Sequence, residues 1–89
     1  MYAIAIHTIS DPEGWWAGAQ ELEVPAGITL HSVIGNGDGT KAVCIWEADA
    51  IDSIRNFVDP ATEGKSTNEY FEVNEQYSMG LPAHAETAP

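Results

Sequence analysis

The chain has 89 residues and a strongly acidic composition, with 14 Asp and Glu residues against three Lys and Arg residues and a formal net charge of −11. One domain is the natural organisation for this length, and so short a chain buries only a small fraction of its surface on its own. Proteins that bind nucleic acids or anionic lipids need a cationic surface. The charge therefore excludes both classes of partner, and no stretch supplies the roughly 18 apolar residues needed to span a bilayer.

The first half of the chain predicts a strand, a helix and a second strand. Residues 2–9 are mainly apolar, which favours a buried strand. Either Ser10 or Asp11 suits a helix N-cap, and the proline that follows suits the first turn, so we expect a helix over 12–22. A break rich in Gly and Pro then leads into a second strand over 28–34.

The second half predicts a hairpin, a helix and a last strand. The run over 35–40 is dense in Gly and Asn, which is typical of a tight turn, and a third strand follows over 41–47. Asp49 is expected to cap a second helix, which should end at the Asp-Pro pair 59–60. The last strand is expected over 68–74.

The element order is therefore β-α-β-β-α-β, which predicts an α+β, ferredoxin-like fold. In that fold, a four-stranded antiparallel sheet carries two helices on one face. We expect residues 1–82 to form this single domain and residues 83–89 to be a disordered C-terminal tail. Cys44 is the only cysteine, and residues 2–9 have no basic leader, so a cytoplasmic protein is expected.

Strand alternation suggests which side chains share a face of the sheet. The helices need large apolar partners, so Ile4, Ile6, Cys44 and Trp46 are expected beneath them. The opposite face would then carry the polar residues His7 and Glu47, with His31, among smaller apolar groups. A few polar groups in an apolar cavity are typical of a small-molecule site.

One stretch carries a family resemblance. Residues 41–55, Lys-Ala-Val-Cys-Ile-Trp-Glu-Ala-Asp-Ala-Ile-Asp-Ser-Ile-Arg, resemble the strand-into-helix signature of dimeric α/β-barrel proteins. The closest look-alikes are small bacterial proteins of unknown or nickel-binding function, and the similarity in element order covers most of residues 2–75. The resemblance implies a homodimer whose two sheets enclose the site. The superfamily includes cofactor-free monooxygenases, isomerases, haem-degrading enzymes and metal binders, so the fold does not select a function.

The candidate site residues follow from this arrangement. As catalytic acid or base groups we consider His7, because a neutral imidazole suits a general base, and Glu47, because burial in the barrel would raise its pKa. Together with His31 they supply a 2-His-1-carboxylate set for a divalent transition metal such as Ni, Zn, Cu or Fe; otherwise no cofactor is expected. The ordinary alternatives are a hydrogen-bonded core histidine at position 7 and a solvated or Arg55-paired carboxylate at position 47. The expected ligand-binding residues are Tyr70, Phe71, Val43 and Ile45.

Three functions remain open from the sequence. The first is a homodimeric barrel that binds a small ligand or a divalent metal in the sheet-enclosed cavity. The second is a cofactor-free monooxygenase or isomerase acting on a small aromatic or polyketide-like substrate, with His7 or Glu47 moving a proton. The third is a protein-interaction module that uses one face of the sheet. Cys44 is expected to be a core residue, because an apolar strand does not favour a thiolate.

Overall fold

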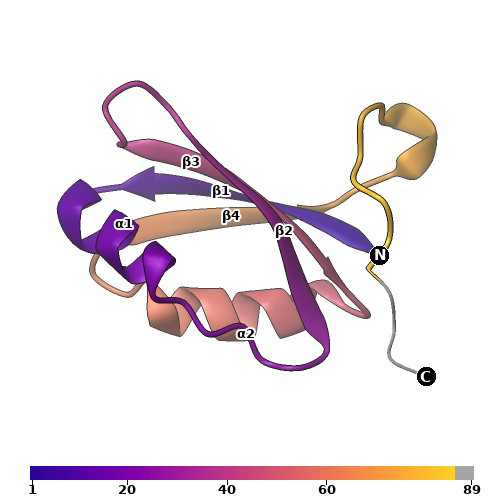
Figure 1. Ribbon diagram of the computed structural model, residues 1–89, viewed down its shortest axis with the longest axis horizontal. Coiled ribbons are helices and arrows are strands. Elements are labelled where there is room, and N and C mark those ends of the chain that lie inside the picture. Colours follow the sequence, from indigo (N-terminus) through magenta and orange to yellow (C-terminus); the bar gives the residue numbers. More distant parts are fainter. Residues whose placement is uncertain (86–89) are drawn as a thin grey trace.

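The computed structural model describes residues 1–85 and confirms the predicted element order. Its elements are β1 (Tyr2–Ile9), α1 (Pro12–Gln20), β2 (Ile28–Gly35), β3 (Lys41–Ala48), α2 (Ile51–Ala61), β4 (Ser66–Glu72) and the short 3-10 helix η1 (Glu75–Tyr77). The four strands form one antiparallel sheet in the order β2-β3-β1-β4, and both helices lie on the same side of it (Figure 1). This is the ferredoxin-like α+β fold. Across residues 1–85, neither α-helix has the length and apolar composition needed to cross a bilayer.

The helix ends differ from the predicted ones in three places. Asp11 caps α1 as expected, since its side chain accepts a hydrogen bond from the backbone N–H of Gly14 at 3.1 Å, but the helix ends at Gln20. The predicted cap of α2 at Asp49 is wrong, because the N-cap residue is Ala50, which makes no side-chain cap. The helix also continues through Pro60 and ends one residue later at Ala61, although proline offers no N–H for a helix hydrogen bond.

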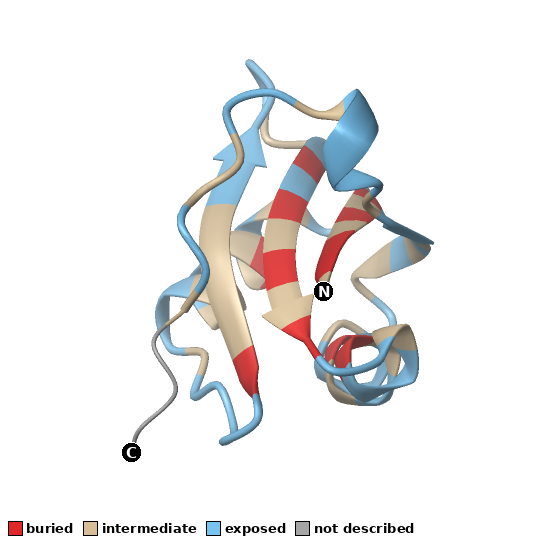
Figure 2. Cartoon of the chain, turned by 90° about the vertical axis from the view of Figure 1, so that its right-hand side faces the viewer, coloured by how far each residue is buried: buried red, intermediate tan, exposed pale blue. Residues whose placement is uncertain are grey.

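The two faces of β1 are reversed relative to the prediction. Ala5 pairs with Cys44, and His7 pairs with Ala42, on the face that the helices cover. Ile4 and Ile6, expected beneath the helices, lie on the opposite face. The alternation of buried and exposed residues is visible along β3 in Figure 2, where the buried bands belong to the covered face.

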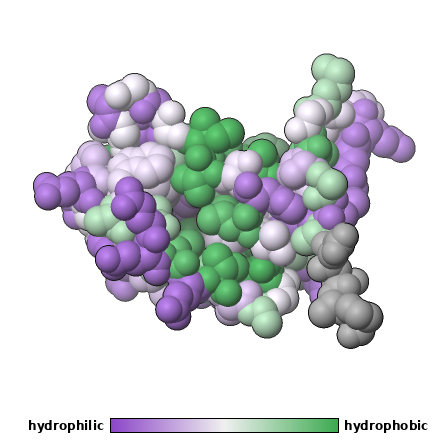
Figure 3. Space-filling view, in the orientation of Figure 1, coloured by the Kyte–Doolittle hydropathy of each residue, from purple (hydrophilic) through white to green (hydrophobic). Residues whose placement is uncertain are grey.

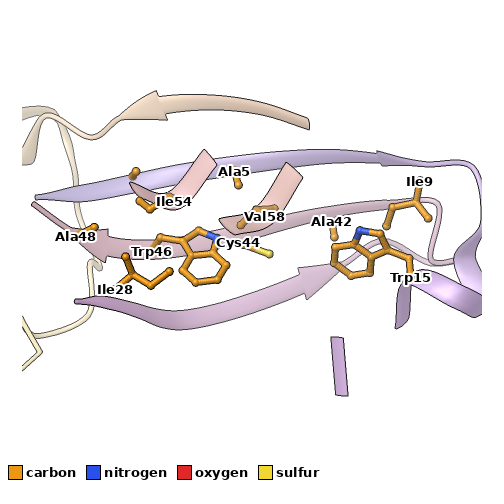
Figure 4. Packing of buried hydrophobic residues seen from close by; sticks show 11 residues of the cluster. Ala5, Ile9, Trp15, Ile28, Ala42, Cys44, Trp46, Ala48, Ile54 and Val58 are labelled. Atoms are coloured by element: carbon orange, nitrogen blue, oxygen red, sulfur yellow. The ribbon is translucent and has the colours of Figure 1, made fainter. Parts of the chain in front are cut away.

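The reversal has a packing reason. The covered face of β1 is lined with small side chains, and the large side chains that fill the space above them come mostly from α1, α2 and β3. Figure 4 shows the indole rings of Trp15 and Trp46 among the small side chains Ala42 and Cys44. From α2, Ile54 and Val58 complete this core. The core is therefore built from small residues on the central strands under large residues on α1, α2 and β3.

The opposite face of the sheet, here called the open face, has no helix on it. Its middle is apolar and is made of aliphatic and aromatic side chains from all four strands, namely Ile4, Ile6, Ile34, Val43, Ile45 and Phe71. Ile34 is 58% exposed and Phe71 is 50% exposed. Such a contiguous apolar surface is characteristic of an interaction site.

The hairpin between β2 and β3 is fixed to α1 by Trp16. Its indole N–H donates a hydrogen bond to the carbonyl of Gly39 at 2.9 Å. A Cβ atom at Gly35 would lie 2.5 Å from the Trp16 ring, so this position needs glycine for the close approach. Gly39 has a φ of 75°, which also favours glycine. Together these contacts place α1 over the end of the sheet at which His7 lies.

Candidate functional site

His7 is the one polar residue buried in the core of the described chain, with 1% of its surface exposed. It lies on the covered face of β1, opposite Ala42 of β3 and Asn68 of β4. The ring of Trp15 lies 5.0 Å from its own ring, between centroids. His7 is therefore held between the sheet and α1, away from bulk water.

The hydrogen-bond network assigns the tautomer of His7. The amide nitrogen of Asn68 donates to Thr62 Oγ1 at 2.8 Å and to Asp59 Oδ1 at 2.9 Å, which leaves Asn68 Oδ1 as an acceptor. His7 Nδ1 lies 2.6 Å from that oxygen and must therefore carry the hydrogen. In the neutral ring the other nitrogen, Nε2, is then an acceptor.

The protonation state follows from the surroundings. Burial lowers the pKa of His7 below its ordinary value of 6.5, although the hydrogen bond to Asn68 and the charge of Asp59 act in the opposite direction. The pKa of Asp59 is itself lowered by hydrogen bonds from Asn68 and from Tyr70, whose hydroxyl lies 2.6 Å from Asp59 Oδ1. At neutral pH, His7 is therefore a neutral imidazole. Its ring is oriented by Asn68, which in turn is hydrogen-bonded to the Asp59 carboxylate.

A cavity lies between the sheet and the two helices, and His7 is part of its wall. The other principal lining residues are apolar or aromatic, namely Trp15, Leu22, Leu30, Trp46 and Phe57. About 70 Å³ of it is accessible to the centre of a water molecule. One water needs roughly 10–15 Å³ by that measure, so the cavity has room for several water-sized groups. Figure 3 shows apolar side chains gathered on the side of the molecule along which β2 runs, between polar ends.

Two residues that line this cavity each carry a ring nitrogen without a hydrogen-bond partner among residues 1–85, namely His7 Nε2 and Trp46 Nε1. Both side chains are at least nine-tenths buried, with 1% and 2% of their surface exposed. A buried polar group without a partner destabilises a fold by about 1–3 kcal/mol, so such groups are uncommon and each needs an explanation. Here one atom accepts and the other donates, and both belong to residues that line the same cavity.

A second polar cluster lies on the open face, around Glu47. Its two oxygens contact His31 Nε2 at 2.8 Å and His84 Nδ1 at 2.7 Å, and the backbone N–H of Ala85 donates to it at 2.8 Å. His31 reaches Glu47 because the register shifts between Leu30 and Ser32, and a bulge of this kind re-aims a side chain.

Hydrogen bonds dominate the titration of this second cluster. The pKa of Glu47 is lowered to about 2, first by the Ala85 N–H and then by His31 and His84. The Glu47 carboxylate in turn raises the pKa of His84 above 6.5. His84 also stacks on Tyr2, with ring centroids 4.6 Å apart. The cluster thus ties the C-terminal segment to the sheet through charge and stacking. The predicted disordered tail begins inside this contact, and residues 86–89 lie outside the described residues.

The structure separates the predicted metal ligands. His7 lies on the covered face, whereas His31 and Glu47 lie on the open face, so the three side chains do not converge and the prediction of one shared face is wrong. Within residues 1–85, no group of three or more His, Cys, Asp or Glu side chains is arranged to hold a metal ion. Cys44 is buried as expected, and burial raises the pKa of its thiol to about 12, so that it is a neutral thiol at neutral pH. A divalent metal stays a prediction that elemental analysis of the purified protein tests.

The predicted ligand-binding residues are also divided between the faces. Val43, Ile45 and Phe71 lie on the open face, whereas Tyr70 lies on the covered face, opposite Ala5. The alternative pairing of Glu47 with Arg55 is not found, because Arg55 binds Asp52 within α2.

Sequence reasoning missed the partners that give His7 its properties. Asn68 and Asp59 lie far from His7 along the chain, and nothing in their local pattern signals the contact. Trp46 was expected to be a core residue, which it is, but its unpartnered N–H depends on the tertiary packing. His84 lies in a segment expected to be disordered, and its pairing with Glu47 was not anticipated.

Comparisons with known proteins add no family to this description. No protein-family model, curated protein or solved structure matches the chain. The fold and the geometry of the two clusters therefore carry the functional argument.

Proposed function

We propose that the protein binds a small, mainly apolar organic molecule in the cavity between the sheet and the helices. The observation that carries this proposal is one mainly apolar cavity lined by His7 and Trp46, the two residues that carry buried, unpartnered nitrogens. Small-molecule sites have this composition, an apolar wall with a few polar groups that fix the orientation of the ligand.

The location of the site differs from the one expected from the sequence. The expected cavity was enclosed by two sheets, whereas this cavity belongs to a single chain. His7 is retained as a site residue, and Trp46 joins it. Glu47 and the open-face residues Val43, Ile45 and Phe71 would not contact a ligand here, because they lie on the other side of the sheet.

A two-dimensional amide NMR titration with a set of small neutral ring compounds tests the location. Ligand binding should move the signals of residues around the cavity, and Ala19→Phe, which fills the cavity from α1, should abolish the change. The control Ile45→Phe places an aromatic ring on the open face instead and should leave binding intact. Signal changes confined to the open face would contradict the proposal.

A second candidate function is proton transfer, with His7 as the general base. It is favoured by the fixed tautomer, in which Asn68 and Asp59 orient the ring and leave Nε2 free to accept a proton. Trp46 Nε1 could donate to a carbonyl oxygen in the same step. Hydrogen–deuterium exchange next to the carbonyl of cyclohexanone, followed by NMR, tests this function. Exchange should be slower with His7→Phe than with the native chain, and equal rates would exclude His7 as the base.

We also propose that two copies of the chain pair through their open faces. The apolar middle of that face, with Ile34 and Phe71 at least half exposed, supports this pairing. A short chain gains stability by burying such a surface against a second copy, and a two-fold pair brings the same patch together from both copies.

Sedimentation equilibrium tests the pairing. The native chain should sediment as a dimer at micromolar concentration, and Ile34→Lys or Phe71→Lys should shift it to a monomer. Val24→Lys changes an exposed apolar residue outside the open face and serves as the control. A native chain that sediments as a monomer would overturn the proposal without affecting the cavity of the single chain.

A further inference from the structure

The C-terminal segment returns to the start of β1 and covers one end of the open face (Figure 1). Within residues 82–85, here called the strap, the carbonyl of Pro82 accepts a hydrogen bond from the Tyr2 hydroxyl. The ring of His84 stacks on the Tyr2 ring at an interplanar angle of 17°. Tyr2 shares the open face with Ile4 but is only 2% exposed, although no helix covers this side of the sheet. The strap therefore contributes to the burial of Tyr2.

Both ring nitrogens of His84 face carboxylates. Nδ1 lies 2.7 Å from Glu47 Oε2, and Nε2 lies 3.3 Å from Glu75 Oε1. A neutral imidazole has one N–H and one lone pair, so one of the two carboxylates would face a lone pair. Only the imidazolium presents a hydrogen to both. The attached position of the strap therefore suits a protonated His84.

The other titratable groups at this contact come from four elements. Tyr2 belongs to β1, Glu47 to β3 and Glu75 to η1, and His31 of β2 contacts the other oxygen of Glu47, Oε1, at 2.8 Å. The pKa of Glu47 is lowered to about 2, and burial raises the pKa of Tyr2, so neither group changes charge near neutral pH. His31 does not contact His84 directly, and its titration can be followed separately.

We propose that the strap is a pH-operated lid, attached while His84 is an imidazolium and released as His84 loses its proton, which uncovers Tyr2 and the Glu47–His31 pair. The hydrogen bond to Glu47 raises the pKa of His84 above 6.5, so the attached strap binds the proton more tightly than a released one. By linkage, attachment is strongest below 6.5 and weakens as the pH rises through the raised value. The lid lies on the open face, so it is independent of the cavity beneath the helices.

Proton and carbon NMR of the full chain between about pH 5 and 9 tests the lid, because hydrogens bound to carbon do not exchange with water. At the acidic end, the rings of Tyr2 and His84 should show a nuclear Overhauser contact, and the methyl group of Ala85 should be rigid. Both signs of attachment should be lost with the midpoint of the His84 titration. Attachment should weaken about tenfold for each pKa unit by which it raises the pKa of His84.

Three variants of exposed residues locate the switch. His84→Arg keeps a planar cation at every pH, so the Ala85 methyl group should stay rigid throughout the titration. Glu75→Gln removes one of the two carboxylates, so release should occur at lower pH. Glu69→Gln makes the same change of charge on the open face beside Ile6, away from Tyr2, and should leave the midpoint unchanged.

Four results would overturn the lid. They are a contact that persists unchanged across the titration, a contact absent at every pH, release that follows the titration of His31 instead of His84, and equal release in His84→Arg. None of them would bear on ligand binding in the cavity, which lies on the other side of the sheet.

Discussion

The two faces of the sheet place histidines in opposite electrostatic surroundings. On the covered face, burial lowers the pKa of His7, and its only side-chain hydrogen-bond partner among residues 1–85 is a neutral amide. On the open face, an exposed His84 meets the Glu47 carboxylate, which raises its pKa. The comparison teaches that desolvation and charge pairing move the same side chain in opposite directions. A neutral, oriented imidazole suits ligand binding, whereas a charged pair suits the attachment of a chain segment.

The faces should differ most in their contribution to stability. Trp46→Ala removes a fully buried indole from the covered face and should lower the free energy of unfolding by about 3–5 kcal/mol. Phe71→Ala removes a half-exposed ring from the open face and should lower it by less than about 1 kcal/mol in the single chain. Urea unfolding at low protein concentration measures both. Equal losses would contradict the assignment of the core to the covered face.

A neighbouring pair in β4 sharpens the same comparison. Asn68 faces the helices and satisfies His7, Thr62 and Asp59, whereas Glu69 faces the open side. Asn68→Ala leaves partners unsatisfied and should lower the free energy of unfolding by about 1–3 kcal/mol. Glu69→Ala should change it by less than about 0.5 kcal/mol. Thermal unfolding of both variants tests whether the network stabilises the fold.

Both His7 and His84 should contribute to the pH dependence of stability, in opposite directions. His7 has a lowered pKa, so its contribution is complete above 6.5 and is lost as the pH falls through that value toward the folded pKa. His84 has a raised pKa, so its contribution is complete below 6.5 and is lost as the pH rises through the folded pKa. Glu47→Gln should bring the pKa of His84 back toward 6.5 and leave that of His7 unchanged. Proton NMR titration of the histidine rings measures both values, and a change at His7 would contradict the separation of the faces.

A small effect is also expected at Arg55. Its ion pair with Asp52 lies on the exposed side of α2, and its guanidinium lies 5.3 Å from the centre of the Tyr70 ring. Exposed pairs of this kind contribute about 0–1 kcal/mol. Arg55→Ala should therefore lower the free energy of unfolding by less than about 1 kcal/mol. A larger loss in urea unfolding would show that Arg55 supports the Asp59 and Tyr70 contacts.

The element order was predictable because Gly-rich turns, a capped helix and apolar runs are local signals. Which residues of β1 lie beneath the helices was not predictable, because placing either Ile4 and Ile6 or Ala3 and Ala5 there satisfies the same alternation. What decides it is the volume that Trp15, Trp46 and α2 bring from other elements, which no local pattern encodes. For the same reason His7, a candidate site residue, was placed on the wrong face of the sheet.

The most direct test of the account is the nitrogen-15 NMR spectrum of the His7 ring, recorded through its long-range couplings to the ring hydrogens. The account predicts a hydrogen on Nδ1 and a bare Nε2 at neutral pH. A hydrogen on Nε2 would contradict the tautomer that Asn68 assigns to His7 and, with it, the role of His7 in the cavity.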